Sequence, residues 1–575
     1  MFRRSSKSSQ LNFFSSVESL LKGRSLKDYE DTEKWHNQFR IQVTNRIDED
    51  FFCPLFYDVF GAPNASIRVL AGMMILKEAR DLSDSQLFEN CPFNLLVRCA
   101  LDLLNIDDTL PVESTYYLLR SSIVAHENET CDNLIEKAFA QVTKLQAIEF
   151  QINGSKIRMD SKLLGSNISW YSRYELIHET VRQAYFIAKS QIARLLTESQ
   201  VILLGRIAGE SVDKVLYRST RSEIETKLTE LGQVIYTIIN GIDDRSLAAL
   251  QTLRSVYNEQ YQVVNNTFHV LLKQDISASS IQSPHDTDCQ HRQKDDQKVK
   301  GYSINVTETC DTDHALNLVT NVLVDTAGAA DCDFLQTAVE ITKEIVTSKI
   351  VTVNADGAYH CPENQEYCEE NEIDLILGTI QEKPSCYDPS FDENGDLVVT
   401  DLNTCTIISS RKVESRREDA EPKWAILNEK NQYRYFTKKE IDTCLLRKQM
   451  AAKATDDLNR RNNVEATIFQ LGYRYPNAKN HFRGIVKHKM WANLRCFWIN
   501  FVWIANYVAG GSPYCAQKAV NRWILPRFSA LNAKTGLVLY SFLCILTKCG
   551  DILSFIFGYP KLIPIFAQNS EKMEF

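Results

Sequence analysis

The 575-residue chain contains no Cys-x-x-Cys pair, although it has sixteen cysteines. Cysteines at that spacing are typical of structural zinc sites and of redox motifs, so neither is favoured. The first residues are Ser-rich and basic and show no secretory signal, so we expect reduced thiols in a cytoplasmic protein. One looser group stays open as a zinc site: His360, Cys361, Cys368 and Cys386.

The chain also lacks an apolar run long enough to cross a membrane. The segment 536–546 stops before Lys548, whereas a spanning helix needs about 20 apolar residues. The net charge of −8 gives no overall basic excess that would indicate nucleic acid. Residues 446–495, however, contain eleven Lys or Arg and only three acids. A local patch of that kind favours contact with phosphate even in an acidic chain.

No proline occurs between Pro111 and Pro284. Within this stretch, apolar residues recur at steps of 4, 3, 4 and 3 positions: Ile224, Leu228, Leu231, Ile235 and Ile238. Such steps form a heptad seam that can join two helices. We therefore expect a helical insertion over about 173–275.

Composition and apolar periodicity predict the structure of the N-terminal and C-terminal regions. Residues 1–28 are expected to form a flexible basic arm. Residues 29–145 show apolar positions near a period of about 3.6 and a candidate N-cap at Ser83, which predicts an all-α DNA-binding domain. It could contain a helix-turn-helix or be a plain helical bundle. Residues 511–575 are expected to form a C-terminal helical tail.

The middle of the chain, residues 146–510, shows the element order of an α/β domain. Elements are expected in this order: strands at 155–160, 301–309 and 316–324, a helix at 333–346, a strand at 348–355, a helix at 362–370 and a strand at 373–380. This order predicts a partly parallel sheet. A turn-rich polar stretch at about 381–450 predicts a small β insertion.

Three acids occupy comparable places in this order. Asp160 and Asp356 each end a predicted strand, and Glu465 lies on a predicted helix. A strand-end Asp often caps a turn, and a helical Glu often faces water, so each acid alone has an ordinary explanation. Sites in open α/β sheets, however, form beyond the carboxyl ends of strands. Glu465 also has apolar neighbours, among which a buried carboxylate would need a partner or a metal.

Together the three carboxylates predict a site for Mg²⁺, which Mn²⁺ could replace. Two such ions can activate water on one side of a phosphodiester and stabilise the leaving oxygen on the other.

Longer stretches carry a family resemblance. They include IRMDSKLLGSNI, VNADGAYHCPENQEYC and RRNNVEATIFQLGYRY in the middle of the chain, and residues 45–61, 65–101 and 283–311. The chain resembles, over about residues 45–510, the DDE transposases of bacterial insertion sequences, in the group numbered eleven eighty-two. The resemblance implies an RNase H-like catalytic core behind an N-terminal helical transposase domain, with Asp160, Asp356 and Glu465 as its catalytic, metal-binding triad.

The resemblance also implies partners and a reaction. A homodimer would bind terminal inverted repeats, cut the DNA at the element's end with two Mg²⁺ ions, and join the end to target DNA. Two alternatives remain, an RNase H-like nuclease without joining activity and an inactive DNA-binding relic. Arg461 keeps the family's place four residues before Glu465, whereas Leu458 and Gly472 replace the Tyr and Lys of many relatives.

The predicted DNA contacts are Arg461, Arg474, Lys487, Lys489 and Trp170. For Trp170, stacking on an unpaired base and packing in the core are both open. Lys487, His488 and Lys489 would contact phosphate or form a solvated face. Asp286 and Asp288 would approach the metal or belong to a polar loop with its own turns.

Overall fold

The computed structural model describes residues 1–4, 15–57, 61, 63–244, 246–264, 267–294, 297–378, 386–392, 396–413, 423–427, 432–453, 462–472 and 479–510. Arg461, Arg474 and the predicted tail at 511–575 lie outside these residues. The range Met1–Gly510 forms one compact unit. None of the helices in the described ranges is long and apolar enough to cross a membrane.

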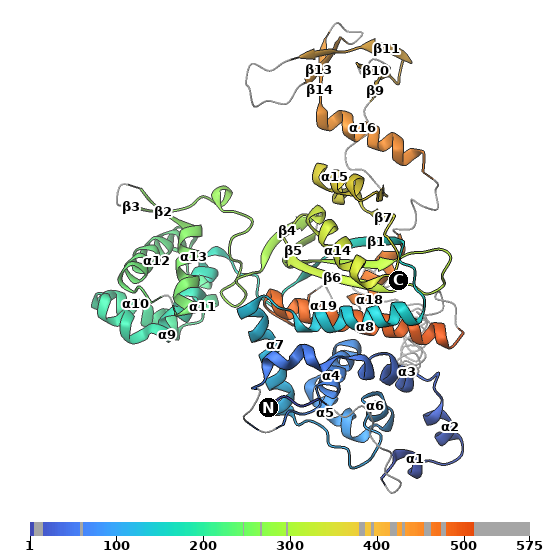
Figure 1. The fold of residues 1–575 in the computed structure, drawn as a ribbon. Coiled ribbons are helices and arrows are strands. Elements are labelled where there is room, and N and C mark those ends of the chain that lie inside the picture. Colours follow the sequence, from blue (N-terminus) through green and yellow to red (C-terminus); the bar gives the residue numbers. More distant parts are fainter. Residues whose placement is uncertain are drawn as a thin grey trace, which may run out of the picture. The chain divides into compact units, whose positions relative to one another are not determined.

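The N-terminal region is helical, as predicted (Figure 1). Its helices are α1 (Val17–Leu20), α2 (Arg24–Glu30), α3 (Trp35–Gln42), α4 (Ile67–Arg80), α5 (Asp84–Phe93), α6 (Leu95–Ala100), α7 (Glu113–Thr130) and α8 (Leu134–Glu149), with 3₁₀ turns η1 (Thr44–Arg46) and η2 (Glu49–Leu55). Ser83 caps α5 in a capping box with Gln86, which confirms the predicted N-cap.

Part of the predicted flexible arm is folded. Residues 17–20 form α1, and the side chain of Val17 is fully buried in a cluster with Tyr29 and Cys99. The backbone amide of Val17 also donates to the carbonyl of Leu104. The Ser-rich composition predicted a flexible arm. The buried side chain of Val17 and its backbone hydrogen bond nevertheless hold this segment in place.

The central sheet has the predicted mixed order. Its strands are β1 (Lys156–Gly165), β4 (Gln290–Lys294), β5 (Gln297–Thr309), β6 (Val319–Thr326), β7 (Thr352–Ala355) and β8 (Asp374–Leu377). They are arranged β4-β5-β1-β7-β8, with β6 also paired to β5. β1 pairs parallel to β7 and antiparallel to β5, and β7 pairs parallel to β8. This mixed sheet behind a helical region is consistent with an RNase H-like core.

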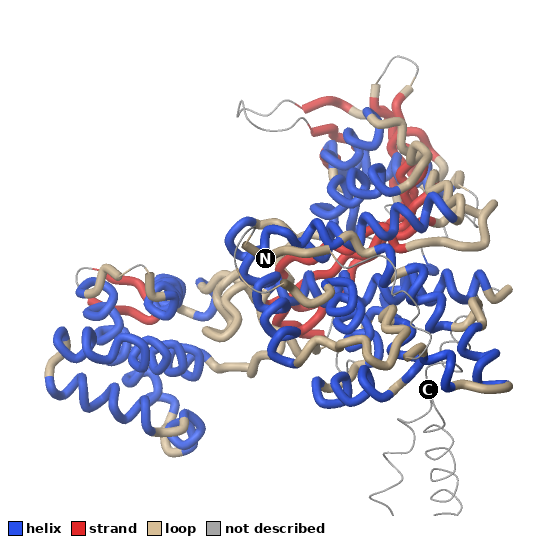
Figure 2. The backbone as a smooth tube through the Cα atoms, turned by 60° about the horizontal axis from the view of Figure 1, so that its bottom comes forward, coloured by secondary structure: helices blue, strands red, loops and turns tan. Residues whose placement is uncertain are grey.

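Helices cover both faces of the sheet (Figure 2). Ile157 and Met159 of β1 point into a core shared with α14 (Leu335–Ile345). On the other side of β1 lies α18 (Asn462–Leu471), which packs against β1 and β5. The predicted helix at 362–370 is α15 (Pro362–Glu370).

The long helix α19 (Ile485–Val508) joins the N-terminal region to the sheet. It packs against β6, α4 and α8 (Figure 1). Phe501 of α19 meets Phe39 edge-on at 5.2 Å between ring centroids, and Phe497 meets Phe139 in the same way at 5.1 Å. Because α19 is buried along most of its length, the helical region and the sheet share one core.

Two insertions interrupt the core. The first holds α9 (Arg173–Leu195), α10 (Glu198–Gly209), α11 (Val212–Tyr217), α12 (Arg221–Gly241) and α13 (Ala248–Gln260), followed by the hairpin β2 (Tyr261–Val264) and β3 (Thr267–Val270). The heptad seam lies on α12 and faces this bundle's own core. The second holds β9 (Tyr387–Phe391), β10 (Leu397–Asp401), β11 (Thr406–Ser409), β12 (Arg411–Val413), β13 (Lys423–Leu427), β14 (Tyr433–Thr437) and α16 (Lys438–Ala451).

Candidate active site

Asp160 and Asp356 lie at matching positions of neighbouring parallel strands. The parallel ladder of β1 and β7 ends with Arg158 opposite Asn354, and each Asp follows two residues later. Asp160 was expected to end its strand, but β1 continues to Gly165 because residues 161–165 keep their antiparallel pairing with β5. The parallel part of the sheet nevertheless ends beside both carboxylates, which is where sites form in such sheets.

Both aspartates make local hydrogen bonds. Asp160 Oδ1 accepts from the amide of Ser161 at 2.9 Å, and Asp356 Oδ1 accepts from the amide of Gly357 at 2.7 Å. The second bond caps the 3₁₀ turn η5 (Gly357–Tyr359), so Asp356 does have the ordinary turn-capping role. An ionised carboxylate has about four lone-pair sites, which leaves capacity for a cation besides one amide.

Glu465 lies in the first turn of α18, and its side chain is exposed. Its apolar neighbours in sequence therefore do not bury it, and Glu465 faces water as a helical Glu often does. The buried stripe of α18 consists of Val464, Thr467, Ile468 and Leu471. At about 100° per residue, Thr467 lies at one edge of this stripe and Glu465 lies just beyond the opposite edge. Thr467 is the edge that contacts β5, so Glu465 lies on the other flank of the helix.

A buried ionic group holds α18 on the sheet. Glu308 of β5 is 0% exposed and accepts hydrogen bonds from Arg158 Nε of β1 and from Thr467 Oγ1, the latter at 2.6 Å. A buried carboxylate is costly without such partners. Arg158 stands two residues before Asp160 and Thr467 two residues after Glu465, so the same bonds orient the segments that carry both acids. Sequence reasoning missed Glu308.

A second contact holds the end of α18. Arg495 of α19 is buried, and its guanidinium donates to the carbonyls of Leu471 at 3.1 Å and Gln470 at 2.7 Å. It also donates to the carbonyl of Glu78 on α4 at 2.7 Å. These are the orphan carbonyls of helix ends, for which a cation is a favourable partner.

The three acids share this region of the fold, but they do not converge. Among the described residues, no three His, Cys, Asp or Glu side chains form a group that could hold a metal ion. The same finding covers the looser zinc candidates around His360 and Cys361. Each of the three acids is engaged by other groups of the chain.

The basic run at 446–495 is largely used by the fold. Lys448 pairs with Asp388 at 2.7 Å, and Lys453 pairs with Asp374. Lys479 Nζ and Arg483 Nε donate to the backbone carbonyls of Ile168 and Asn167, respectively. Among the described residues of this run, several cations are therefore held in place by contacts within the fold.

The predicted contacts at 487–489 differ from one another. Lys487 is exposed, whereas Lys489 lies 3.7 Å from Glu127, a buried acid of α7. Burial raises the pKa of Glu127 to about 7 although Lys489 opposes the rise. His488 cannot contact phosphate, because it is fully buried against Tyr302 at 4.2 Å between rings and burial lowers its pKa to about 4. It is a neutral core histidine.

Trp170 is not a core residue, because 54% of its side chain is exposed. Lys300 Nζ lies 5.1 Å from the centre of its ring, and His291 meets the ring edge-on at 6.3 Å. His291 and Lys300 stand opposite each other on β4 and β5. The indole face is thus available on a basic hairpin, which suits a base next to a phosphate.

Asp286 is a structural residue. It is buried and accepts hydrogen bonds from Tyr302 Oη, Ser166 Oγ and, at 3.0 Å, the amide of Gly484. Asp288 Oδ2 accepts from the amide of Ile485 at 3.4 Å. Both acids tie their loop to the start of α19, which favours the loop interpretation over the metal one.

Comparison with known proteins bears on the helices of the N-terminal region. Residues 27–122 match the family model described as Transposase domain (DUF772). The chain carries a transposase domain. No curated protein and no solved structure matched the chain. A transposase domain implies DNA binding, and the matched segment runs from within α2 to within α7.

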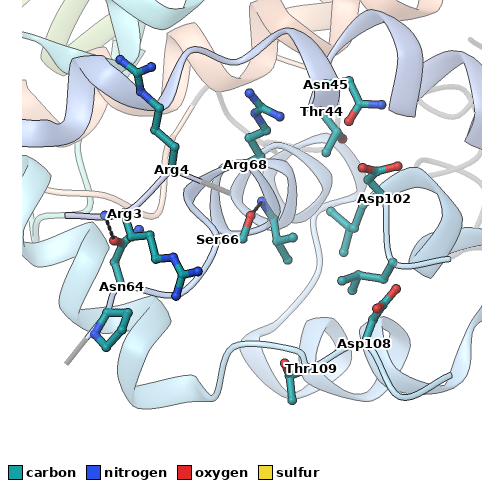
Figure 3. Close-up of a pocket in the computed structure, with 14 residues that line it drawn as sticks. Arg3, Arg4, Thr44, Asn45, Asn64, Ser66, Arg68, Asp102, Asp108 and Thr109 are labelled. Atoms are coloured by element: carbon teal, nitrogen blue, oxygen red, sulfur yellow. Dashed lines mark hydrogen bonds between the residues drawn. The ribbon is translucent and has the colours of Figure 1, made fainter. Parts of the chain in front are cut away.

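The transposase domain contains a polar cavity of about 580 Å³ (Figure 3). Arg3, Arg4 and Arg68 line one side of it, and Asp102 and Asp108 line the other. Arg4 is paired with Asp50. The Nε of Arg68 donates to the carbonyl of Ile47 at 3.1 Å, which holds this guanidinium at the cavity wall.

We predict that Glu308→Ala lowers the free energy of unfolding by about 3 kcal/mol, because Arg158 would lose its buried counter-charge. Thr467→Val should cost about 1 kcal/mol, since it removes one hydrogen bond and keeps the shape. Urea unfolding monitored by circular dichroism measures both values. The control is Thr226→Val on the exposed face of α12, which should change stability little. Equal effects of the two threonine changes would contradict a special role for Thr467.

Proposed function

We propose that the protein is a DDE transposase of a bacterial insertion sequence, in the group numbered eleven eighty-two, with an RNase H-like core. The observation that carries this is the placement of Asp160 and Asp356 at matching positions past the parallel ladder of β1 and β7, beside α18 with Glu465. It occurs in a chain whose N-terminal helices match a transposase domain. The homodimer expected from the resemblance belongs to the same proposal.

Asp160, Asp356 and Glu465 would hold two Mg²⁺ ions. Oxygen ligands from carboxylates suit this cation, and three like charges gathered without a cation would repel one another. The two aspartates already stand on adjacent strands, and Glu465 would reach them from the exposed flank of α18. Bound Mg²⁺ would lower the pKa of water and offset charge on phosphate oxygens.

The chain's own residues would set where the DNA lies. The three acids would fix the position of the scissile phosphate, first for hydrolysis at the end of the element and then for attack by the freed 3′-hydroxyl on target DNA. Both steps exchange one oxygen for another at phosphorus, so one site serves both. The rigid attachment of α18 through Glu308 and Arg495 would keep Glu465 in place between the two steps.

The test is charge removal at each acid. Asp160→Asn, Asp356→Asn and Glu465→Gln should each reduce cleavage of the DNA that flanks the gene by more than about 100-fold, because a lost ligand leaves the water less activated. Binding of the same DNA should persist, since a negative charge near phosphate is gone. Cleavage in Mg²⁺ or Mn²⁺ and binding by fluorescence anisotropy are the measurements.

Glu225→Gln, on α12 of the helical insertion, is the matched control, because its exposed carboxylate pairs with Arg221 of the same helix. A triad variant that cuts as fast as this control would exclude that residue as a ligand.

The cavity of the transposase domain would contact the phosphate backbone through Arg3 and Arg68. The double variant Arg3→Ala, Arg68→Ala should weaken binding of end DNA and reduce the slope of log affinity against log salt by about 0.9 for each lost contact. Arg221→Ala, an exposed arginine of α12, is the control. An unchanged slope would remove this cavity from the DNA interface. Point variants are preferable to truncation, because α4 and α19 share one core.

Trp170 would stack on an unpaired base during end processing. Trp170→Ala should reduce cleavage by about 10-fold and Trp170→Phe by much less, because stacking needs an aromatic face. Both variants should keep the stability of the wild type, since the indole is more than half exposed. Cleavage rates with 2-aminopurine at the DNA end measure the effect. Equal loss in both variants would point to the indole N–H or to packing instead.

A further inference from the structure

Lys162 lies on β1, on the same side of the sheet as Asp160. It follows Asp160 by two residues, so the two side chains leave the strand on the same side. This is the side that α18 covers, because Arg158, two residues before Asp160, meets Glu308 and Thr467 there. The positive charge of Lys162 therefore belongs to the surface between β1 and α18.

The position of its ammonium group is set by a glycine. A Cβ added at Gly472 would lie 3.3 Å from Lys162 Nζ, which is closer than ordinary contact. The amide of Gly472 still donates to the carbonyl of Ile468, so the helical turn continues to this residue. Gly472 is seven residues after Glu465, about two turns, and lies on the same flank of the helix. The missing side chain makes room for the ammonium group on the flank that carries Glu465.

Lys162 forms no ion pair with any of the described residues. The lysines of the basic run contrast with it, since Lys448, Lys453 and Lys489 each pair with an acid. Within the described ranges, Lys162 thus keeps its charge for a ligand.

A site with three carboxylates repels the phosphates of DNA. We propose that Lys162 is a DNA-phosphate contact at the acid site, positioned over Gly472 and binding the backbone next to the scissile phosphate. This role deepens the proposed function and rests on it. The ligand is the phosphodiester backbone of the DNA end.

The experiment compares four proteins on the DNA that flanks the gene: wild type, Lys162→Ala, Lys162→Arg and the double variant Lys162→Ala, Gly472→Lys. Lys162→Ala should slow cleavage by about 10- to 100-fold, the effect of losing one charge-assisted hydrogen bond. It should also reduce the salt slope of binding by about 0.9. Lys162→Arg should retain the slope. The double variant should regain cleavage, because a lysine at 472 places its ammonium group in the vacated space.

Lys349→Ala is the matched control, because Lys349 is an exposed lysine paired with Glu372 and should leave cleavage and slope unchanged. A lysine that only neutralised the acids would, when removed, lower the free energy of unfolding and leave the salt slope unchanged, which would overturn the inference. Normal cleavage by Lys162→Ala would overturn it too, while leaving the triad proposal intact. If the wild type binds this DNA but does not cut it, the proposed catalysis fails and the salt slope alone decides the role of Lys162. A wild type that neither binds nor cuts overturns both.

Discussion

The buried carboxylate of Glu308 connects the three elements on which the candidate site depends. It lies on β5, takes one hydrogen bond from β1 and one from α18, and is sealed from water. Such a charge is stabilised only when its partners hold their positions, so it constrains β1 and α18 more tightly than apolar packing would. Arg495 adds a second fixed point at the far end of α18. With two anchors, the helix can neither rotate nor slide, and the flank with Glu465 keeps its direction.

The transposase domain and the sheet are coupled by the same helix that supplies Arg495. α19 is buried on almost every side, with N-terminal helices against one part of its surface and β6 against another. Its guanidinium at Arg495 reaches both α18 and α4. A displacement of α4 by bound DNA would therefore also shift α18, because Arg495 and the packed core connect the two helices. Close-packed interiors transmit such strain.

The sheet could be predicted from sequence because its signals are local. Runs of β-branched residues bounded by turn residues marked β5, β6, β7 and β8, and the order of strands and helices implied the parallel part. The extension of β1 beyond Asp160 could not be predicted, because it depends on pairing with β5 more than 130 positions later. The exposure of Glu465 stayed open for a related reason. Apolar neighbours in sequence show only that one stripe of a helix is buried, and the side on which Glu465 falls depends on what α18 packs against.

The roles of the polar residues were the hardest to predict. Glu308 stands in the otherwise uncharged segment 301–309 of β5, a signal that could have marked it as paired, but its partners Arg158 and Thr467 come from both ends of the core. His488 has two lysine neighbours, which suggested phosphate contact, yet its ring is in the core. The direction in which a side chain leaves its helix decides whether it is buried, since adjacent residues point about 100° apart.

Charge counted along the chain therefore gives a poor guide to where DNA would lie. Several described cations of the 446–495 run, Lys448, Lys453 and Lys489, are paired with acids, so their charge is balanced within the fold. Arg495 is buried on backbone carbonyls and cannot reach DNA. Balanced charges contribute little to a field outside the protein. The cations that remain, such as Lys162 on β1 and Lys300 beside Trp170, come from strands that no count of local charge singles out. They lie along the same pair of strands, β1 and β5, as Asp160 does. Under the proposed function, a DNA backbone that follows these two strands would meet Asp160, the ammonium group of Lys162 and the exposed indole of Trp170.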